Sequence, residues 1–276
     1  MMVKLHDQHL HSRHSIDSKA DPVANCEQAL AAGLGGLTFT EHYDMHPTER
    51  GTCQWDYDAI AATIEGLRRR FSPGLEIGFG IEVDYQAAQM EEILGYLDRH
   101  AFDVVLLSVH WCGGRPLHLP RRWQGLTAAD MRRDYLAELR GAADLCRELA
   151  AGGRRPFDIV SHLDYVKRYL VDYWDTPLAA LTEDELDPIL QAFIAAGVIP
   201  EINTAGLRRD EAEAYPTWEI LERYRELGGE LVSIGSDAHR SVDIGHGFDA
   251  VAARLKAIGF AGEAVFRARE QRVIHW

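Results

Sequence analysis

The chain has 276 residues, of which 46% are hydrophobic and 26% are charged, so it is long enough to bury a substantial core in one domain. Its 43 acidic residues outnumber the 29 basic ones and give a formal charge of -14, which argues against a nucleic-acid binder, because such proteins present a basic surface to phosphates. No apolar run reaches the roughly 18 residues of a membrane span, and the N-terminal segment lacks the apolar stretch of a signal peptide, so we expect a cytoplasmic protein without a membrane partner.

Strand-like apolar runs alternate with amphipathic helical segments along the whole chain. The expected strands lie near residues 3–9, 36–41, 76–83, 103–109, 157–162, 198–203 and 231–236. The expected helices lie at residues 22–34, 57–71, 87–99, 128–151, 183–196, 216–227 and about 249–258. This alternation is typical of repeated β/α units around a parallel sheet. No shift in composition marks a domain boundary, so residues 1–276 are expected to form a single domain.

Histidines and carboxylates stand at the ends of most of these apolar runs. His9 and His11 close the first strand, and Asp237 and His239 follow the last one. Residues at i and i+2 of an extended strand point to the same face, so each pair can present two ligands toward one point. The runs between them are followed by further residues of the same kinds, namely Glu41, His42, Glu82, His110 and His162. Imidazole and carboxylate are the usual ligands of zinc, manganese and iron, so the pattern indicates a metal centre.

Two other features bear on the site. The four cysteines, Cys26, Cys53, Cys112 and Cys146, lack a CxxC spacing, which argues against a zinc ribbon or a disulfide framework. The largest irregular segment, residues 111–127, follows His110 and is expected to cover the mouth of the site, where loops of β/α barrels carry specificity.

In seven ordered segments the chain resembles the PHP (polymerase and histidinol phosphatase) superfamily, and within it the histidinol-phosphatase-like phosphoesterases. These segments are Asp7-Gln8-His9-Leu10-His11-Ser12, Thr40-Glu41-His42, Gly80-Ile81-Glu82, Ser108-Val109-His110, Ser161-His162, Glu201-Ile202-Asn203-Thr204 and Gly235-Ser236-Asp237-Ala238-His239. The resemblance implies an α/β fold, a distorted (β/α)7 barrel with a trinuclear metal site at the C-terminal ends of its strands. The seven expected strands agree with this fold.

The resemblance also implies how two to three divalent ions (Zn, Mn or Fe) would be held. The first ion would take His9, His11, Glu82 and Asp237. The second would take Glu82, His110 and His162, so that Glu82 bridges the two. The third would take His42, His239 and the residue six positions after His11, which is Asp17 here, with His14 as a competing candidate.

Further roles follow from the same resemblance. Glu82, Asp237 and His239 are the expected catalytic residues. Arginines grip phosphate in the family, which points to Arg208 and to Lys167 or Arg168, and Asn203 is expected to orient a ligand or the substrate. Metal-bound imidazoles usually donate to an outer carboxylate, for which the candidates are Asp7, Glu41 and Asp164.

The favoured function is that of a metal-dependent phosphomonoester hydrolase, specifically a histidinol-phosphatase of histidine biosynthesis. Such an enzyme converts L-histidinol phosphate and water to L-histidinol and phosphate, using a metal-bridging hydroxide. The expected partner is therefore a small phosphorylated substrate. The alternatives are a PHP enzyme acting on another small phosphoester or on DNA, an amidohydrolase-like hydrolase, and a metal-binding protein without turnover. The sequence leaves the oligomeric state open.

Overall fold

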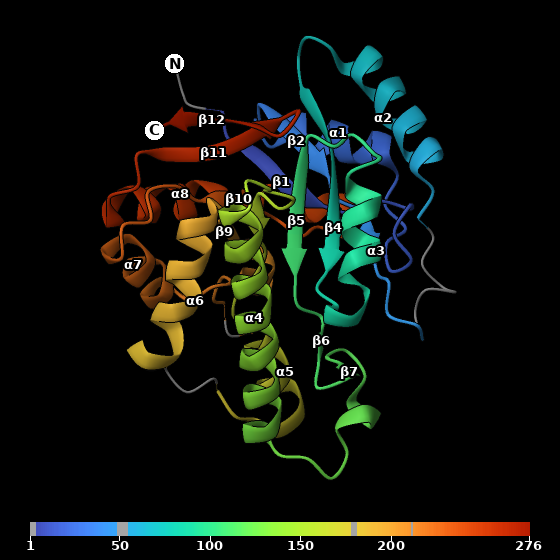
Figure 1. Ribbon diagram of the computed structural model, residues 1–276. Coiled ribbons are helices and arrows are strands. Elements are labelled where there is room, and N and C mark those ends of the chain that lie inside the picture. Colours follow the sequence, from blue (N-terminus) through green and yellow to red (C-terminus); the bar gives the residue numbers. More distant parts are fainter. Residues whose placement is uncertain (1–3, 49–54, 178–180, 211) are drawn as a thin grey trace.

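Eight parallel strands form the main sheet of the computed structural model, which describes residues 4–48, 55–177, 181–210 and 212–276. Seven of them follow one another in the order β1-β2-β4-β5-β8-β9-β10, and the short β3 pairs with β4 (Figure 1). Their bounds are β1 His6–Leu10, β2 Gly36–Phe39, β3 His42–Tyr43, β4 Glu76–Asp84, β5 Val104–Ser108, β8 Ile159–Val160, β9 Ile199–Asn203 and β10 Ser233–Gly235.

The sheet curves so that its first and last strands meet. The amide of Asp237 donates to the carbonyl of His9 at 2.7 Å, and the amide of His11 donates to the carbonyl of Ala238 at 2.9 Å. These bonds join the end of β1 to the residues that follow β10. The predicted seven-stranded barrel is therefore confirmed.

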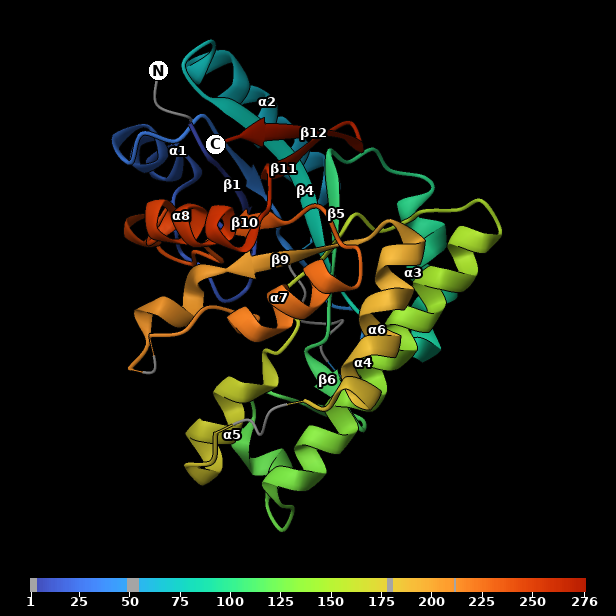
Figure 2. The same cartoon turned by 90° about the vertical axis from the view of Figure 1, so that its left-hand side faces the viewer.

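Helices surround the barrel, and most begin and end where the sequence predicts. Their bounds are α1 Pro22–Ala31, α2 Tyr57–Phe71, α3 Met90–Leu97, α4 Ala128–Ala151, α5 Val166–Trp174, α6 Glu183–Ala196, α7 Trp218–Glu226 and α8 Phe248–Ile258. Capping boxes at Thr127 and Thr182 fix the starts of α4 and α6, because each threonine and the acidic residue three positions later satisfy backbone amides of the first turn. Helices α4 and α6 lie side by side, and α5 lies near the N-terminal end of α4 (Figure 2).

Helix α5 was not predicted from the sequence. It follows soon after β8 and is rich in aromatic and β-branched residues of weak helix propensity. The hairpin of β11 (Gly262–Arg267) and β12 (Glu270–His275) was not predicted either. Both residues of its turn, Ala268 and Arg269, have positive φ. Glycine or asparagine usually marks such a turn, and this turn has neither.

Residues 111–127 are more ordered than the predicted irregular loop. They contain the hairpin of β6 (Trp111–Cys112) and β7 (Arg115–Pro116) and a short helix, η2 (Pro120–Trp123). Both tryptophans are buried, and the indole of Trp123 donates to the carbonyl of Pro116 at 2.9 Å. The segment lies beyond the C-terminal end of β5, as expected for a wall of the site (Figure 1).

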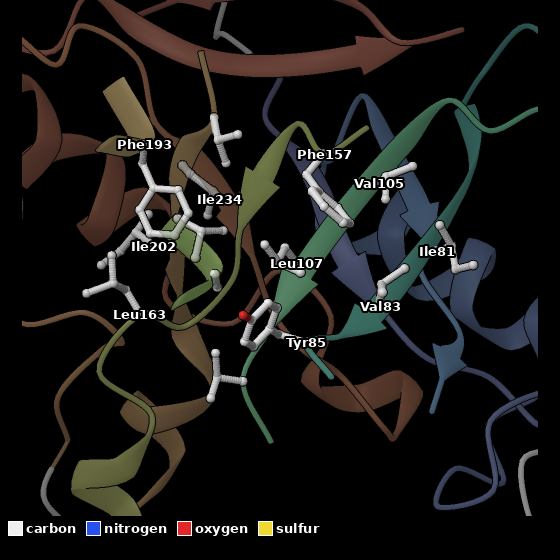
Figure 3. Packing of buried hydrophobic residues seen from close by; sticks show 14 of the residues in the cluster. Ile81, Val83, Tyr85, Val105, Leu107, Phe157, Leu163, Phe193, Ile202 and Ile234 are labelled. Carbon is white, nitrogen blue, oxygen red and sulfur yellow. The ribbon is translucent and has the colours of Figure 1, made fainter. Parts of the chain in front are cut away.

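The hydrophobic core has two layers on opposite faces of the sheet, because successive strand side chains point to opposite faces. The outer layer packs residues such as Val105 and Leu107 of β5 against the helices (Figure 3). The inner layer contains Val104, Leu106, Ile159 and Ile199 of the strands, and it is completed by Ala264 and Phe266 of β11. The C-terminal hairpin therefore closes the inside of the barrel, at the end opposite the β6–β7 segment (Figure 1).

Two carboxylates anchor this hairpin to the barrel. Asp103, just before β5, accepts from the amides of Phe79 at 2.7 Å and Ala268 at 2.9 Å. Asp158, just before β8, accepts from the amide of Val105 at 2.8 Å and from Arg269 at 2.5 Å. The turn of the hairpin is thus tied to the starts of two strands.

None of the helices in the described ranges is both long and apolar enough to span a lipid bilayer. Cys26, Cys112 and Cys146 are buried free thiols, in line with the expected absence of a disulfide framework. Cys53 lies outside the described residues.

Candidate metal centre

Four of the predicted ligands converge between the first and last strands of the barrel. The Nε2 atoms of His9 and His11 lie 3.2 Å apart, and Oε2 of Glu82 lies 3.4 Å from the first and 3.5 Å from the second. Oδ1 of Asp237 lies 3.8 Å and 3.4 Å from the same two nitrogens. Ligands about 2.0–2.2 Å from a tetrahedral ion lie about 3.3–3.6 Å from one another, so this spacing suits a single ion.

A second group gathers around the other oxygen of Glu82. Oε1 lies 3.1 Å from Nε2 of His162 and 3.4 Å from Nε2 of His110, and these two nitrogens are 3.4 Å apart. The two oxygens of one carboxylate thus face two separate ligand groups. This is the arrangement of a bridging ligand.

The third predicted group lies at the more open side of the cluster. Oδ2 of Asp17 lies 3.4 Å from Nε2 of His42 and 3.1 Å from Nε2 of His239. His14, the competing candidate, instead directs its Nε2 to the hydroxyl of Thr63 at 3.1 Å. The structure therefore places Asp17, and not His14, with the other two predicted ligands.

The buried bridging carboxylate tests whether this donor set fits metal ions. Glu82 is 1% exposed, and its Oε2 has no hydrogen-bond partner among the described residues, although imidazole nitrogens of three histidines lie within 3.5 Å. A buried carboxylate oxygen that is left without a donor is costly, and a cation would satisfy it. In each of three overlapping sets, the ligand atoms lie within 4.8 Å of one another; the sets are His9, His11 and Asp237, then His42, Glu82 and His110, and then His11, His42 and His239. Imidazole with carboxylate is a zinc or manganese donor set.

Glu201 supports the cluster, a role that was not predicted from the sequence. Its Oε1 accepts from Nδ1 of His9 at 2.8 Å, and its Oε2 accepts from the amide of His162 at 3.0 Å. The approach requires glycine at position 235, since a Cβ there would overlap both the Glu201 carboxylate and Cβ of His9. Glu201 is thus the outer carboxylate that orients a ligand imidazole directly.

The three outer carboxylates proposed from sequence have other contacts. Asp7 accepts from the amide of Ser236 at 2.8 Å, and Asp164 accepts from the amide of Thr217 at 2.9 Å. Glu41 is fully buried and accepts from two serine hydroxyls. Asp7 also accepts from the backbone amide of His9 at 3.4 Å, and Glu41 acts on His11 through the hydroxyl of Ser15.

Asn203 lies beside two carboxylates of the cluster. It is fully buried, and its amide donates to Glu201 at 3.1 Å and to Asp237 at 3.3 Å. It therefore orients a ligand, which is one of its two predicted roles, and it has no exposed atom for the other role, contact with substrate.

Charges within the cluster shift the pKa values of the first two histidines in opposite directions. Burial lowers the pKa of His9, but the carboxylates of Glu201 and Glu82 outweigh this effect and hold that pKa well above its usual value. Burial and the neighbouring imidazoles lower the pKa of His11 to about 3. A lowered pKa favours the neutral form of the His11 imidazole, which is the form that binds metal ions.

Two of the predicted ligands have a strained backbone. His162 has φ 24° and Asp237 has φ 51°, both in the region that non-glycine residues seldom adopt. The amide of each is fixed by a hydrogen bond, to Glu201 and to the carbonyl of His9 respectively. Such strain persists where surrounding contacts enforce it, and it is concentrated at functional sites.

The three basic residues predicted to bind substrate differ in their contacts. Arg208 donates to the carbonyls of Ser236 and Asp237, at 2.8 Å and 3.3 Å, so it lies against the backbone of a predicted ligand. Arg168 is partly exposed and donates to the hydroxyl of Tyr165 at 2.7 Å. The ring of Tyr165 in turn stacks on His162, with the ring centroids 4.4 Å apart.

Lys167, in contrast, is engaged in the protein. Its ammonium donates to the carbonyl of Ala214 at 2.7 Å and to Glu213 at 3.0 Å, and it lies 3.2 Å from the buried Asp164. Of the adjacent pair, Arg168 is therefore the one that contacts a ring stacked on a predicted ligand.

A cavity of about 530 Å³ lies beside this region, between α5, α6 and α7. Lys167 and Arg168 line it, and none of the predicted metal ligands does. Pro177 and Leu181, which also line it, flank residues 178–180, which lie outside the described ranges.

A parallel barrel with histidines and carboxylates clustered at the C-terminal ends of its strands defines a metal-dependent hydrolase. Comparison with known proteins is more specific. A family model described as the PHP domain matches residues 7–205. The chain belongs to the PHP domain family, as its resemblance predicts.

Curated relatives of the chain are named as histidinol-phosphatases. The probable histidinol-phosphatase of Clostridium acetobutylicum is 30% identical over 88% of this chain and 89% of its own length. That of Deinococcus radiodurans is 29% identical over 94% of this chain and 95% of its own length. Among solved structures, the histidinol phosphate phosphatase of Lactococcus lactis, crystallised with zinc, L-histidinol and phosphate, has a TM-score of 0.79 at 24% identity and covers 98% of this chain and 100% of its own. This structural likeness confirms the fold.

Proposed function

We propose that this chain is a histidinol-phosphatase that releases phosphate from L-histidinol phosphate. The observation that carries the proposal is the convergence of the nine predicted ligands, in three groups, at the C-terminal end of the barrel. The names of the curated relatives support the choice of substrate, and the solved Lactococcus lactis enzyme, bound to L-histidinol and phosphate, supports it further.

Three divalent ions are proposed for the centre. The first is held by His9, His11, Glu82 and Asp237. The second is held by Glu82, His110 and His162, and the third by Asp17, His42 and His239. Zinc is the first choice for their identity, because the donors are mainly imidazoles and because the Lactococcus lactis enzyme was crystallised with zinc.

Phosphate ester hydrolysis needs an activated water and stabilisation of negative charge on the phosphoryl oxygens, and bound divalent ions supply both. The residues of this chain would hold the ions and keep their ligands oriented. Glu82 fixes the spacing of two ligand groups through its two oxygens. Glu201 and Asn203 keep His9 and Asp237 oriented.

Arg168 is proposed as the phosphate-binding residue of the adjacent basic pair. Its guanidinium lies 5.7 Å from the ring centre of Tyr165 and 5.2 Å from that of Tyr169, which holds it beside His162 while its tip stays accessible. A guanidinium can bind two phosphate oxygens at once, which suits this task. Arg208 is the second proposed phosphate ligand.

Substitution of Arg168 and of Lys167 should distinguish a phosphate-binding residue from a structural one. We expect Arg168→Ala to raise KM for the phosphoester about 10- to 100-fold, because a hydrogen bond to a charged group contributes about 1.5–3 kcal/mol, and to leave the melting temperature near that of the wild type. We expect Lys167→Ala to lower the melting temperature, because it leaves the buried Asp164 without its cation. Steady-state kinetics and thermal unfolding of both variants measure the difference. The reverse pattern would contradict the assignment.

The substrate is tested by measuring phosphate released from L-histidinol phosphate and from a panel of other small phosphomonoesters by the metal-loaded protein. We expect kcat/KM to be highest for L-histidinol phosphate and activity to disappear with a chelator and return with zinc or manganese. Faster turnover of another ester would replace the substrate and leave the reaction class standing. Lack of metal-dependent turnover on every ester would refute the phosphatase assignment.

A further inference from the structure

The hydroxyl of Ser15 lies between residues of the first and third ligand groups. It is 3.1 Å from Nδ1 of His11, 3.1 Å from the backbone amide of His42 and 2.5 Å from Oε2 of Glu41. Ser15 is 2% exposed, so these contacts are sheltered from solvent. A single buried side chain thus contacts a ligand of each group and a buried carboxylate.

The directions of these three hydrogen bonds follow from their partners. A carboxylate accepts and a backbone amide donates, so the hydroxyl proton of Ser15 points to Glu41 and one lone pair faces the amide of His42. The remaining lone pair accepts from Nδ1 of His11. The proton of His11 is thereby placed on Nδ1, and its Nε2 lone pair faces Asp237 and the other ligands.

The carboxylate of Glu41 is itself held in one position by hydrogen bonds. It is fully buried, and both of its oxygens accept from the amide of Ser12, at 3.1 Å and 3.0 Å. The Ser12 hydroxyl donates to the same carboxylate at 2.5 Å. Held by these bonds, Glu41 determines where the Ser15 hydroxyl can lie.

The ring of His11 is also packed between two ligands of the third group. It stacks on His42 with the ring centroids 4.2 Å apart and on His239 with the centroids 4.3 Å apart. A rotation of His11 would therefore displace both neighbouring rings. The third member of that group, Asp17, follows Ser15 by two residues in the same turn, where Ser15 is buried and Asp17 is exposed.

We propose that Ser15, held by Glu41, is a positioning residue that couples the first and third ion sites, so that retention of the third ion depends on the Ser15 hydroxyl. The proposal rests on the ligand assignment of the proposed function. Among the described residues neither His110 nor His162 contacts Ser15, so their site should be independent of it.

The test is a zinc titration of apo-protein against a chromophoric chelator, with metal content measured after dialysis. We expect the wild type to retain three ions. Ser15→Ala should bind the third ion about 10- to 100-fold more weakly, the size of effect usual when an outer partner of a ligand imidazole is lost, because a released His11 ring would displace the His42 and His239 rings stacked on it. Ser15→Thr, which keeps a hydroxyl, should retain the third ion. Ser233→Ala is the matched control, because Ser233 is also buried and its hydroxyl has no hydrogen-bond partner among the described residues.

Folding of each variant is checked by circular dichroism. If Ser15→Ala does not fold, Ser15→Cys replaces it, since a thiol is a weak hydrogen-bonding group and should lose the third ion while Thr retains it. Wild-type affinity for three ions in the Ala or Cys variant would overturn the proposal, as would a wild type that holds only two. Because binding is measured without substrate, these outcomes are independent of whether L-histidinol phosphate is hydrolysed.

Discussion

Replacement of Glu82 by Gln is expected to lower kcat for phosphate release by about 10³-fold or more, while the protein remains folded. The two oxygens of Glu82 face the ligand nitrogens of two groups, at 3.4 Å from Nε2 of His9 and 3.1 Å from Nε2 of His162. An amide has one oxygen and a neutral charge, so it cannot bridge two cations in the same way. Metal ions contribute several kcal/mol of charge stabilisation in such reactions, and about 4 kcal/mol corresponds to 10³-fold in rate.

The experiment compares kcat and bound metal for wild type, Glu82→Gln and Glu76→Gln. Glu76 lies on the same strand but at its other end, where it is partly exposed and pairs with Arg272. Its substitution should therefore leave activity and metal content at wild-type levels. A Glu82→Gln enzyme with near wild-type kcat would show that this carboxylate does not bridge the ions.

Replacement of Phe266 by Ala is expected to lower the free energy of unfolding by about 3–5 kcal/mol, the usual cost of emptying the volume of a buried phenyl ring. Phe266 is 6% exposed and lies in the inner core with Leu106, Ile159 and Ile199. Because this layer has no helix residues, none of the described helices is placed to refill the space.

Chemical denaturation of the two proteins measures this loss. Val242→Ala is the control, since Val242 is 71% exposed and its substitution should change stability by about 0.5 kcal/mol or less. A Phe266→Ala protein as stable as the wild type would mean that the hairpin does not complete the inner core.

Most of the proposed metal ligands were predictable from the sequence because they lie at or just after the end of an apolar strand, and parallel strands bring their C-terminal ends to one end of a barrel. His9 and Glu82 lie near the ends of β1 and β4, and His110 and His162 follow β5 and β8. Asp17 follows no strand and was identified only by its distance from His11 in the family pattern. Its placement beside His42 and His239 agrees with that identification.

The supporting residues were harder to predict, because their roles depend on contacts across the barrel. Glu201 lies within β9, and only the absence of a side chain at Gly235 lets it reach His9. Lys167 and Arg168 could not be separated in the sequence, because helix α5, which directs adjacent side chains to different sides, was not recognised. The hairpin that closes the inner core carries no turn signal at Ala268 and Arg269.

The meeting of the first and last strands has a consequence for biosynthesis of the protein. His9 and His11 are synthesised before Asp237, which follows them by more than 200 residues. Phe266, which completes the inner core, is added later still. The ligand set proposed for the first ion is therefore complete only after Asp237 has been synthesised, although its first two members come early.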